Sequence, residues 1–159
     1  MHVETLMEYL EEEGFRNFYF CGGRYNLLWP TPYIKKWSKK SAEIYEVVNS
    51  PNLIWSFGNP EVHISNTKIE SLFLRVVKEV KPDIIHFHEL ESLTGSLLSI
   101  ARGFKIPYLV DIHNYWYLCP QRDLIDTNKK VCTDWNDGIK CSTCKVLPSP
   151  SRLAWMFAG

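Results

Sequence analysis

The region from residue 67 to residue 113 constrains the fold most, because short apolar runs alternate there with helical patterns. Apolar residues recur at helical spacing between residues 69 and 80, and the run IIHFH follows at 84–88. A second helical pattern covers 93–104, and YLVDIH follows at 108–113. Strands that alternate with helices favour parallel pairing through right-handed crossovers. The chain is therefore expected to be an α/β protein with a Rossmann-like, doubly wound parallel sheet.

The first half of the chain indicates further elements of such a domain. A helix with an apolar stripe is predicted over residues 3–12, and strands are predicted at 17–21 and 43–49. Residues 22–42 are expected to be irregular because glycine and proline punctuate them. Residues 50–65 are expected to form a long aromatic loop, and loops of this length are often functional. Thr67 and Glu70 are expected to form the capping box of the long helix.

The composition indicates one globular domain over residues 1–159, without a charge pattern for nucleic acid. Eighteen basic and eighteen acidic residues give a net charge of zero. Such a balance provides no electrostatic footprint for a nucleic acid. The sequence has neither a signal-peptide pattern nor an apolar run long enough to span a bilayer. A cytoplasmic location is expected.

Polar residues follow the two strands predicted in the second half of the chain. His88 and Glu89 end the first, and His113 and Asn114 end the second. Ligands of doubly wound sheets lie beyond the carboxyl ends of the strands, so these residues are expected to face one crevice. An imidazole there can donate to sugar hydroxyls or phosphate oxygens, which makes His113 the catalytic candidate. A histidine that only braces the loop remains an alternative.

The other two polar residues of these strands are harder to assign. We expect His86 and His88 to lie on opposite faces of their strand and therefore not to serve one site together. For His86 a hydrogen-bonded core position is favoured, whereas for His88 the core and functional interpretations are equally open. Asp111 lies within the last strand and would need a partner if it were buried. The sequence does not identify that partner.

A Cys-rich loop is expected between residues 119 and 144. Cys119 and Cys132 are spread widely, whereas Cys141 and Cys144 are separated by two residues, as in one half of a tetrahedral zinc site. Few aliphatic residues lie between them, so a bound metal would help to order the loop. Four thiolates would make a closed, structural zinc site. Free buried thiols and redox chemistry remain alternatives.

The segment that begins NPEVHIS and ends YLCPQ, residues 59–121, resembles the N-terminal domain of glycosyltransferase family 4. The specific combination is KPDIIHFHE, a helix, GFKIPYLVDIHNYW and LCP. The resemblance implies half of a GT-B fold, in which two Rossmann-like domains face each other across a cleft. It also implies retaining transfer of a sugar from a nucleotide-sugar donor, without a metal cofactor for catalysis. The pathway implied is polysaccharide or glycolipid biosynthesis.

The resemblance also implies roles for individual residues. His113 matches the histidine that contacts the transferred sugar, and His88 with Glu89 matches the strand end beside the acceptor. Asn114 stands where aspartate is frequent. The substrate-binding set expected on this basis is His88, Glu89, Asn114, Tyr115 and Trp116, with the two aromatic residues forming a wall behind His113.

The chain is expected to be only the acceptor-binding part of such an enzyme. The family's Gly-Gly loop would align near Met1, where there is no glycine, and no donor-binding domain follows in this sequence. We therefore expect the chain alone to be inactive as a hexosyltransferase. Its expected partners are a nucleotide-sugar donor, held by a further domain, and a glycan or lipid-linked acceptor, which would imply peripheral membrane contact. A non-catalytic glycan-binding module and a zinc-stabilised interaction module are the alternatives.

Overall fold

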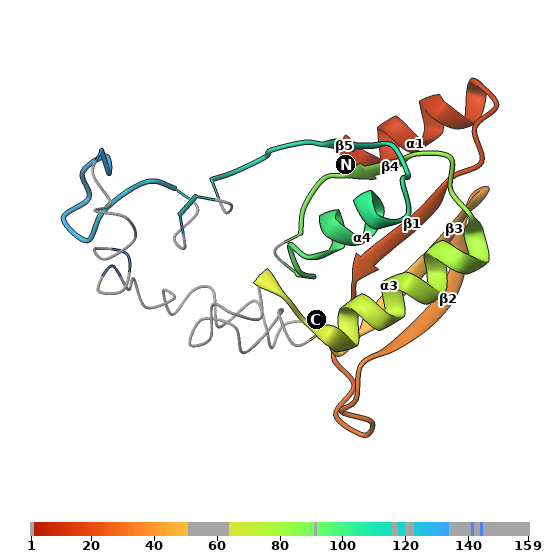
Figure 1. The fold of residues 1–159 in the computed structure, drawn as a ribbon, viewed down its shortest axis with the longest axis horizontal. Coiled ribbons are helices and arrows are strands. Elements are labelled where there is room, and N and C mark those ends of the chain that lie inside the picture. Colours follow the sequence, from red (N-terminus) through yellow and green to blue (C-terminus); the bar gives the residue numbers. More distant parts are fainter. Residues whose placement is uncertain are drawn as a thin grey trace. The chain divides into compact units, whose positions relative to one another are not determined.

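The chain forms two compact units in a computed structural model, Met1–Ile112 and His113–Gly159. The structure describes residues 2–50, 64–90, 92–115, 118–119, 123–133, 141 and 144. Most of the predicted aromatic loop and Trp116 lie outside these residues. The named helices and strands of the described residues lie in the first unit in the following order (Figure 1): α1 (His2–Glu12), β1 (Phe18–Gly22), β2 (Tyr33–Lys39), β3 (Ala42–Val48), α3 (Thr67–Val80), β4 (Ile85–Phe87), α4 (Leu97–Gly103) and β5 (Tyr108–Val110).

The core of the first unit is built around β3. This strand is central in a three-stranded sheet of order β1-β3-β2, parallel to β1 and antiparallel to β2. Its apolar side chains are almost fully buried, including Ile44 and Val47. The expectation that residues 22–42 are irregular was wrong for β2. That strand lies at the sheet edge with mostly exposed side chains, so it shows no apolar alternation by which to recognise it.

Helix α3 has the bounds that its periodicity predicts. Its buried face consists of Ile69, Leu72, Phe73, Val76 and Val77. The Phe73 ring lies 5.2 Å from that of Phe20 in β1 and 6.3 Å from that of Phe87 in β4. A single helix therefore contacts strands of both sheets through one phenylalanine, and Figure 1 shows it lying across the three-stranded sheet.

The start of α3 differs from the expected capping box. Asn66, rather than Thr67, is the N-cap, and its side chain accepts a hydrogen bond from the Ile69 N–H at 3.2 Å. Glu70 accepts the backbone N–H of Asn66 at 3.1 Å. The correction is physically reasonable because asparagine caps helices at least as well as threonine.

Strands β4 and β5 form a separate two-stranded parallel sheet, joined by α4. The α/β class with parallel pairing is therefore confirmed. One continuous doubly wound sheet stays a prediction, since the described strands form two small sheets. The apolar run at 108–110 suggests a buried strand, but this is wrong: all three residues of β5 are exposed, with Leu109 at 55%. Strand β5 lies at the edge of its sheet, where packing covers it less.

The loop after β4 shows how the ends of the strands are placed. Ser50, just after β3, donates its hydroxyl to the carbonyl oxygen of Ser92 at 2.6 Å. A methyl group on Gly22, at the end of β1, would lie 2.8 Å from the Ser92 Oγ atom. The loop that leaves the carboxyl end of β4 thus contacts the carboxyl ends of β1 and β3. All three ends lie on the same side of the first unit.

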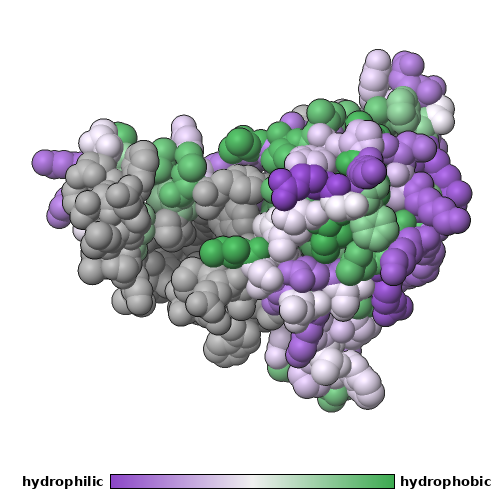
Figure 2. Space-filling model, in the orientation of Figure 1, coloured by the Kyte–Doolittle hydropathy of each residue, from purple (hydrophilic) through white to green (hydrophobic). Residues whose placement is uncertain are grey.

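Charged residues cover the outer surface of the first unit. Glu4 of α1 pairs with Lys39 at 2.5 Å, and Glu8 pairs with Lys40 in the turn between β2 and β3. In Figure 2 the surface near α1, α3 and the end of β2 is mostly hydrophilic, with apolar patches between the charges. Exposed pairs of this kind add little stability each. No helix among the described residues is long and apolar enough to cross a membrane.

Candidate functional site

The carboxyl ends of β4 and β5 bring polar residues together. The parallel register pairs His86 with Leu109 and Phe87 with Val110, so His88 and Asp111 follow at neighbouring strand ends. The backbone N–H of Asp111 donates to the carbonyl oxygen of Phe87 at 2.8 Å, which continues the pairing beyond β5. The position of this carboxylate is therefore set by backbone contacts of the sheet.

His86, His88 and Asp111 form a compact cluster, referred to below as the His-Asp cluster. Both His86 Nε2 and His88 Nδ1 lie 3.2 Å from the Oδ2 atom of Asp111. The two imidazole rings are 4.0 Å apart between centroids, with an angle of 35° between their planes. The partner that Asp111 needs is thus a pair of imidazoles.

The expectation that His86 and His88 lie on opposite faces was wrong. Alternation along a strand places adjacent residues on opposite faces, so residues two positions apart share a face. His86 and His88 are two positions apart, and both reach Asp111. The sequence signal that could have identified the cluster is a pair of histidines two positions apart, His86 and His88, followed by Asp111 at the end of the next parallel strand.

One atom of the cluster lacks a hydrogen bond. His86 Nε2 is buried and has no hydrogen-bond partner. Its 3.2 Å contact with Asp111 is within ion-pair distance but lacks the alignment that a hydrogen bond requires. A buried polar atom in this state destabilises the fold unless something else satisfies it.

The other expected site residues are divided between the two units. Glu89 follows His88 in the first unit and is exposed. His113 begins the second unit and is exposed, Asn114 is half-buried, and the Tyr115 side chain is 50% exposed. The Tyr115 carbonyl oxygen accepts the N–H of Cys119 at 2.7 Å. The convergence of His113 with His88 stays a prediction.

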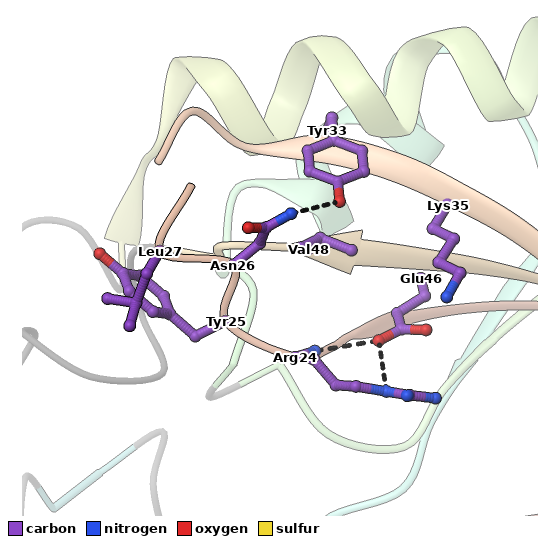
Figure 3. Close-up of a pocket in the computed structure, with 8 residues that line it drawn as sticks. All are labelled: Arg24, Tyr25, Asn26, Leu27, Tyr33, Lys35, Glu46 and Val48. Atoms are coloured by element: carbon purple, nitrogen blue, oxygen red, sulfur yellow. Dashed lines mark hydrogen bonds and ion pairs between the residues drawn. The ribbon is translucent and has the colours of Figure 1, made fainter. Parts of the chain in front are cut away.

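A pocket that the sequence did not indicate lies at the carboxyl ends of β1 and β3 (Figure 3). Its volume is about 310 Å³, and its polar lining includes Arg24, Asn26, Lys35 and Glu46. Figure 3 shows the side chain of Asn26 pointing toward the Tyr33 hydroxyl, with which it shares a 3.3 Å hydrogen bond.

The buried carboxylate of Glu46 organises one wall of this pocket. It accepts the Arg24 N–H at 2.9 Å and the Trp37 Nε1–H at 3.0 Å, and the Arg24 guanidinium lies 3.6 Å away. A buried carboxylate is tolerated when donors surround it in this way. Gly23 allows the close approach, since a methyl group there would lie 2.0 Å from the Glu46 Cγ atom.

The second unit gathers the four cysteines of the predicted Cys-rich loop. None of the four forms a disulfide; Cys119 is buried and the other three are half-buried. Burial raises the pKa of the Cys141 thiol, and the nearby thiols of Cys119, Cys132 and Cys144 raise it further. Among the described residues, no three of these sulfur atoms lie within 4.8 Å of one another. Four soft sulfur donors are the set that a structural zinc ion prefers.

A short hairpin presents one of these cysteines. Ile125 and Val131 form an isolated antiparallel bridge, and the Cys132 N–H donates to the Leu124 carbonyl oxygen at 2.7 Å. Asp126 closes the turn by accepting the backbone N–H groups of Asn128 and Lys130. Those bonds hold the pKa of Asp126 below its usual value.

Comparison of the chain with protein-family models, with curated proteins and with solved structures gave no match. The function is therefore inferred from the geometry of each unit.

Proposed function

We propose that the chain is the N-terminal, acceptor-binding part of a retaining glycosyltransferase that uses a nucleotide-sugar donor. The observation that carries the proposal is the polar edge at the strand ends. The pocket around Glu46 and the residues after β4 both lie at the carboxyl ends of parallel strands. Contacts of Ser92 place the ends of β1, β3 and β4 on one side. Ligands of α/β sheets bind at such an edge.

The arrangement of strands also supports a Rossmann-like, doubly wound sheet as the frame of this site. Two parallel pairs are present, and α3 packs on β1 and on β4 through Phe73. Strands β1 and β4 are edge strands of their sheets, so each has one edge that is not paired with another strand among the described residues. In this proposal the two sheets belong to one half of a GT-B fold.

The site residues have distinct roles in the proposed reaction. The pocket offers guanidinium, amide, ammonium and carboxylate groups, which can bond with the hydroxyls of an acceptor sugar. Glu89 and His88 lie beside the acceptor, and His113 donates to the transferred sugar. Asn114, Tyr115 and Trp116 enclose that sugar. The donor nucleotide is held by a further domain.

Saccharide binding to the purified chain tests the proposal without requiring turnover. We expect saturation-transfer NMR to detect binding of members of a panel of oligosaccharides and lipid-linked glycans. Glu89→Gln should weaken this binding by roughly a factor of ten, the scale of one hydrogen bond to a charged group. Lys78→Ala, an exposed change on α3, is the matched control and should leave binding unchanged.

A second measurement tests the division of labour between domains. The chain alone should not consume UDP- or GDP-sugars, whereas with a donor-binding domain His113→Ala should slow transfer by about a hundredfold. Donor turnover by the isolated chain, or the absence of any bound saccharide, would contradict the proposal.

The Cys-rich loop favours a second role within the same chain. We propose that Cys119, Cys132, Cys141 and Cys144 hold a structural zinc ion. The four thiols within one short stretch, two of them in a Cys-x-x-Cys pair, support this assignment. Should saccharide binding be absent and zinc present, a zinc-stabilised interaction module becomes the better description of the chain.

A further inference from the structure

We propose that His86, His88 and Asp111 form a second metal site, which binds a divalent transition-metal ion of the Zn²⁺ type. The ion would be coordinated by His86 Nε2, His88 Nδ1 and a carboxylate oxygen of Asp111. The proposal does not rest on the transferase function, because the cluster stands on its own geometry. It is also separate from the cysteines, which belong to the other unit.

The distances within the cluster match those of a coordinated ion. Zinc binds imidazole nitrogen and carboxylate oxygen at about 2.0–2.1 Å, so two ligand atoms of a tetrahedral site lie about 3.3 Å apart. Both nitrogen-to-Oδ2 distances are 3.2 Å, and all three ligand atoms lie within 4.8 Å of one another.

The buried nitrogen of His86 gives an independent reason to place an ion here. This atom is enclosed yet has no hydrogen-bond partner. If the two imidazoles and the carboxylate were held together by hydrogen bonds alone, His86 Nε2 would be aligned with Asp111. It is not aligned in that way. A bound cation would satisfy the lone pair of His86 Nε2 and the charge of Asp111 together.

The ligand types select the class of metal. Two imidazole nitrogens and one carboxylate oxygen suit zinc and its first-row neighbours, whereas Ca²⁺ and Mg²⁺ prefer oxygen ligands alone. Three protein ligands leave a coordination position for water or a bound molecule. The Asp111 side chain is 40% exposed, so that position can be reached from solvent. The cluster therefore differs in kind from a closed four-cysteine site.

The backbone holds the ligands before an ion arrives. His86 lies within β4, and the Asp111 N–H is bonded to Phe87 between the two histidines. Ligands carried on paired strands lose little freedom when they bind a metal. Binding should thus cost little rearrangement.

Zinc titration by calorimetry tests the site in a full-length chain that carries Cys119→Ser, Cys132→Ser, Cys141→Ser and Cys144→Ser, which removes the four competing thiols of the second unit. We expect one Zn²⁺ to bind per chain. Asp111→Asn should weaken binding by roughly a factor of ten or more. The matched control is Asp83→Asn, which changes an exposed carboxylate just before β4 and should leave the affinity unchanged. Absence of zinc binding, or equal affinity in Asp111→Asn, overturns the proposal.

A spectroscopic measurement keeps the proposal testable if Asp111→Asn fails to fold. In the ¹⁵N-labelled chain with Asp111 intact, Zn²⁺ should shift the ring nitrogens His86 Nε2 and His88 Nδ1, and should leave the His113 ring unchanged. Shifts confined to His113 or to the other nitrogens overturn the assignment. Saccharide binding is read separately through Glu89, so failure of the metal site and failure of the proposed function can be distinguished.

Discussion

At the scale of single residues, Glu46 and Gly23 determine whether the polar pocket can exist. The carboxylate is buried and bonded to Arg24 and Trp37, and Gly23 leaves no room for a methyl group beside it. Burial and the charge of Glu46 also raise the pKa of Cys21 to about 11. That thiol therefore stays protonated at neutral pH.

Gly23→Ala should lower the free energy of unfolding by about 1–3 kcal/mol, because Glu46 must move and leave its donors. Gly103→Ala is the matched control, since a methyl group at Gly103 meets no atom within 4 Å. Alanine is the better helix former by about 1 kcal/mol, so the control should be neutral or stabilising. Urea unfolding of the three chains measures both effects. Equal stability of Gly23→Ala and the parent chain would mean that Glu46 adapts at little cost.

For single residues, the sequence predicted which side chains are chemically important better than it predicted which of them lie together. Residue type and strand position are enough to identify His88 as a candidate site residue and to predict that Asp111 needs a partner. That His86 belongs to the same cluster as His88 and Asp111 depends on which positions of the two strands share a face. The same holds for Glu46, whose burial results from contacts with residues far away in sequence.

At the scale of elements, Glu70 links the starts of two helices. Its carboxylate accepts the hydroxyls of Ser65 at 2.7 Å and Ser96 at 2.6 Å, in addition to the Asn66 N–H. Ser96 is the N-cap of α4. These bonds, that from Ser96 most strongly, lower the pKa of Glu70 from its ordinary value of 4.5.

The sign of the resulting pH dependence follows from this lowered pKa. The unfolded chain binds a proton at Glu70 more readily than the folded chain, so the stabilisation is complete above pH 4.5 and is lost as the pH falls through the folded pKa. Glu70→Gln should therefore destabilise the protein at neutral pH, and the difference from the parent should shrink in acid. Urea midpoints between pH 7 and pH 3 measure this. Glu12→Gln, at the end of α1, is the control; a constant difference for Glu70→Gln would contradict the assignment.

Which elements the sequence predicts depends on how strongly burial patterns them. Helix α3 has one buried face, and its bounds follow from periodicity alone. Strand β2 was missed because its Lys-rich surface faces solvent and its pairing with β3 supplies the structure. Strand β5 was found by its apolar run, yet its exposure depends on neighbours that the run does not specify.

At the scale of the whole molecule, the described residues of the second unit contain no α-helix and no named strand that could order the cysteines. A zinc ion at the four cysteines would supply that order, since metal binding contributes directly to folding. Elemental analysis of protein purified without added metal should find zinc. Cys141→Ser with Cys144→Ser should reduce the zinc content by one ion per chain and increase cleavage by proteases between Cys119 and Lys145.

The parent chain treated with a chelator is the comparison for this variant. If the variant retains its zinc and resists proteases as the parent does, the cysteines are packing residues.

Local alternation of helices and strands was sufficient to predict the α/β class. It could not specify that the strands form two sheets, because sheet order depends on contacts such as that of Ser92 with Ser50.

The parallel pairings described above also affect the order in which the chain can fold. Lys39 and Ala42 pair across a tight turn, so the β2–β3 hairpin closes almost no loop. Ile85 and Tyr108 pair only after the chain has passed through α4, and Phe18 and Glu43 only after it has passed through β2. Loop closure costs entropy before the contact returns any stabilisation, which slows non-local pairing. Both polar sites of the first unit thus depend on the slower class of contact.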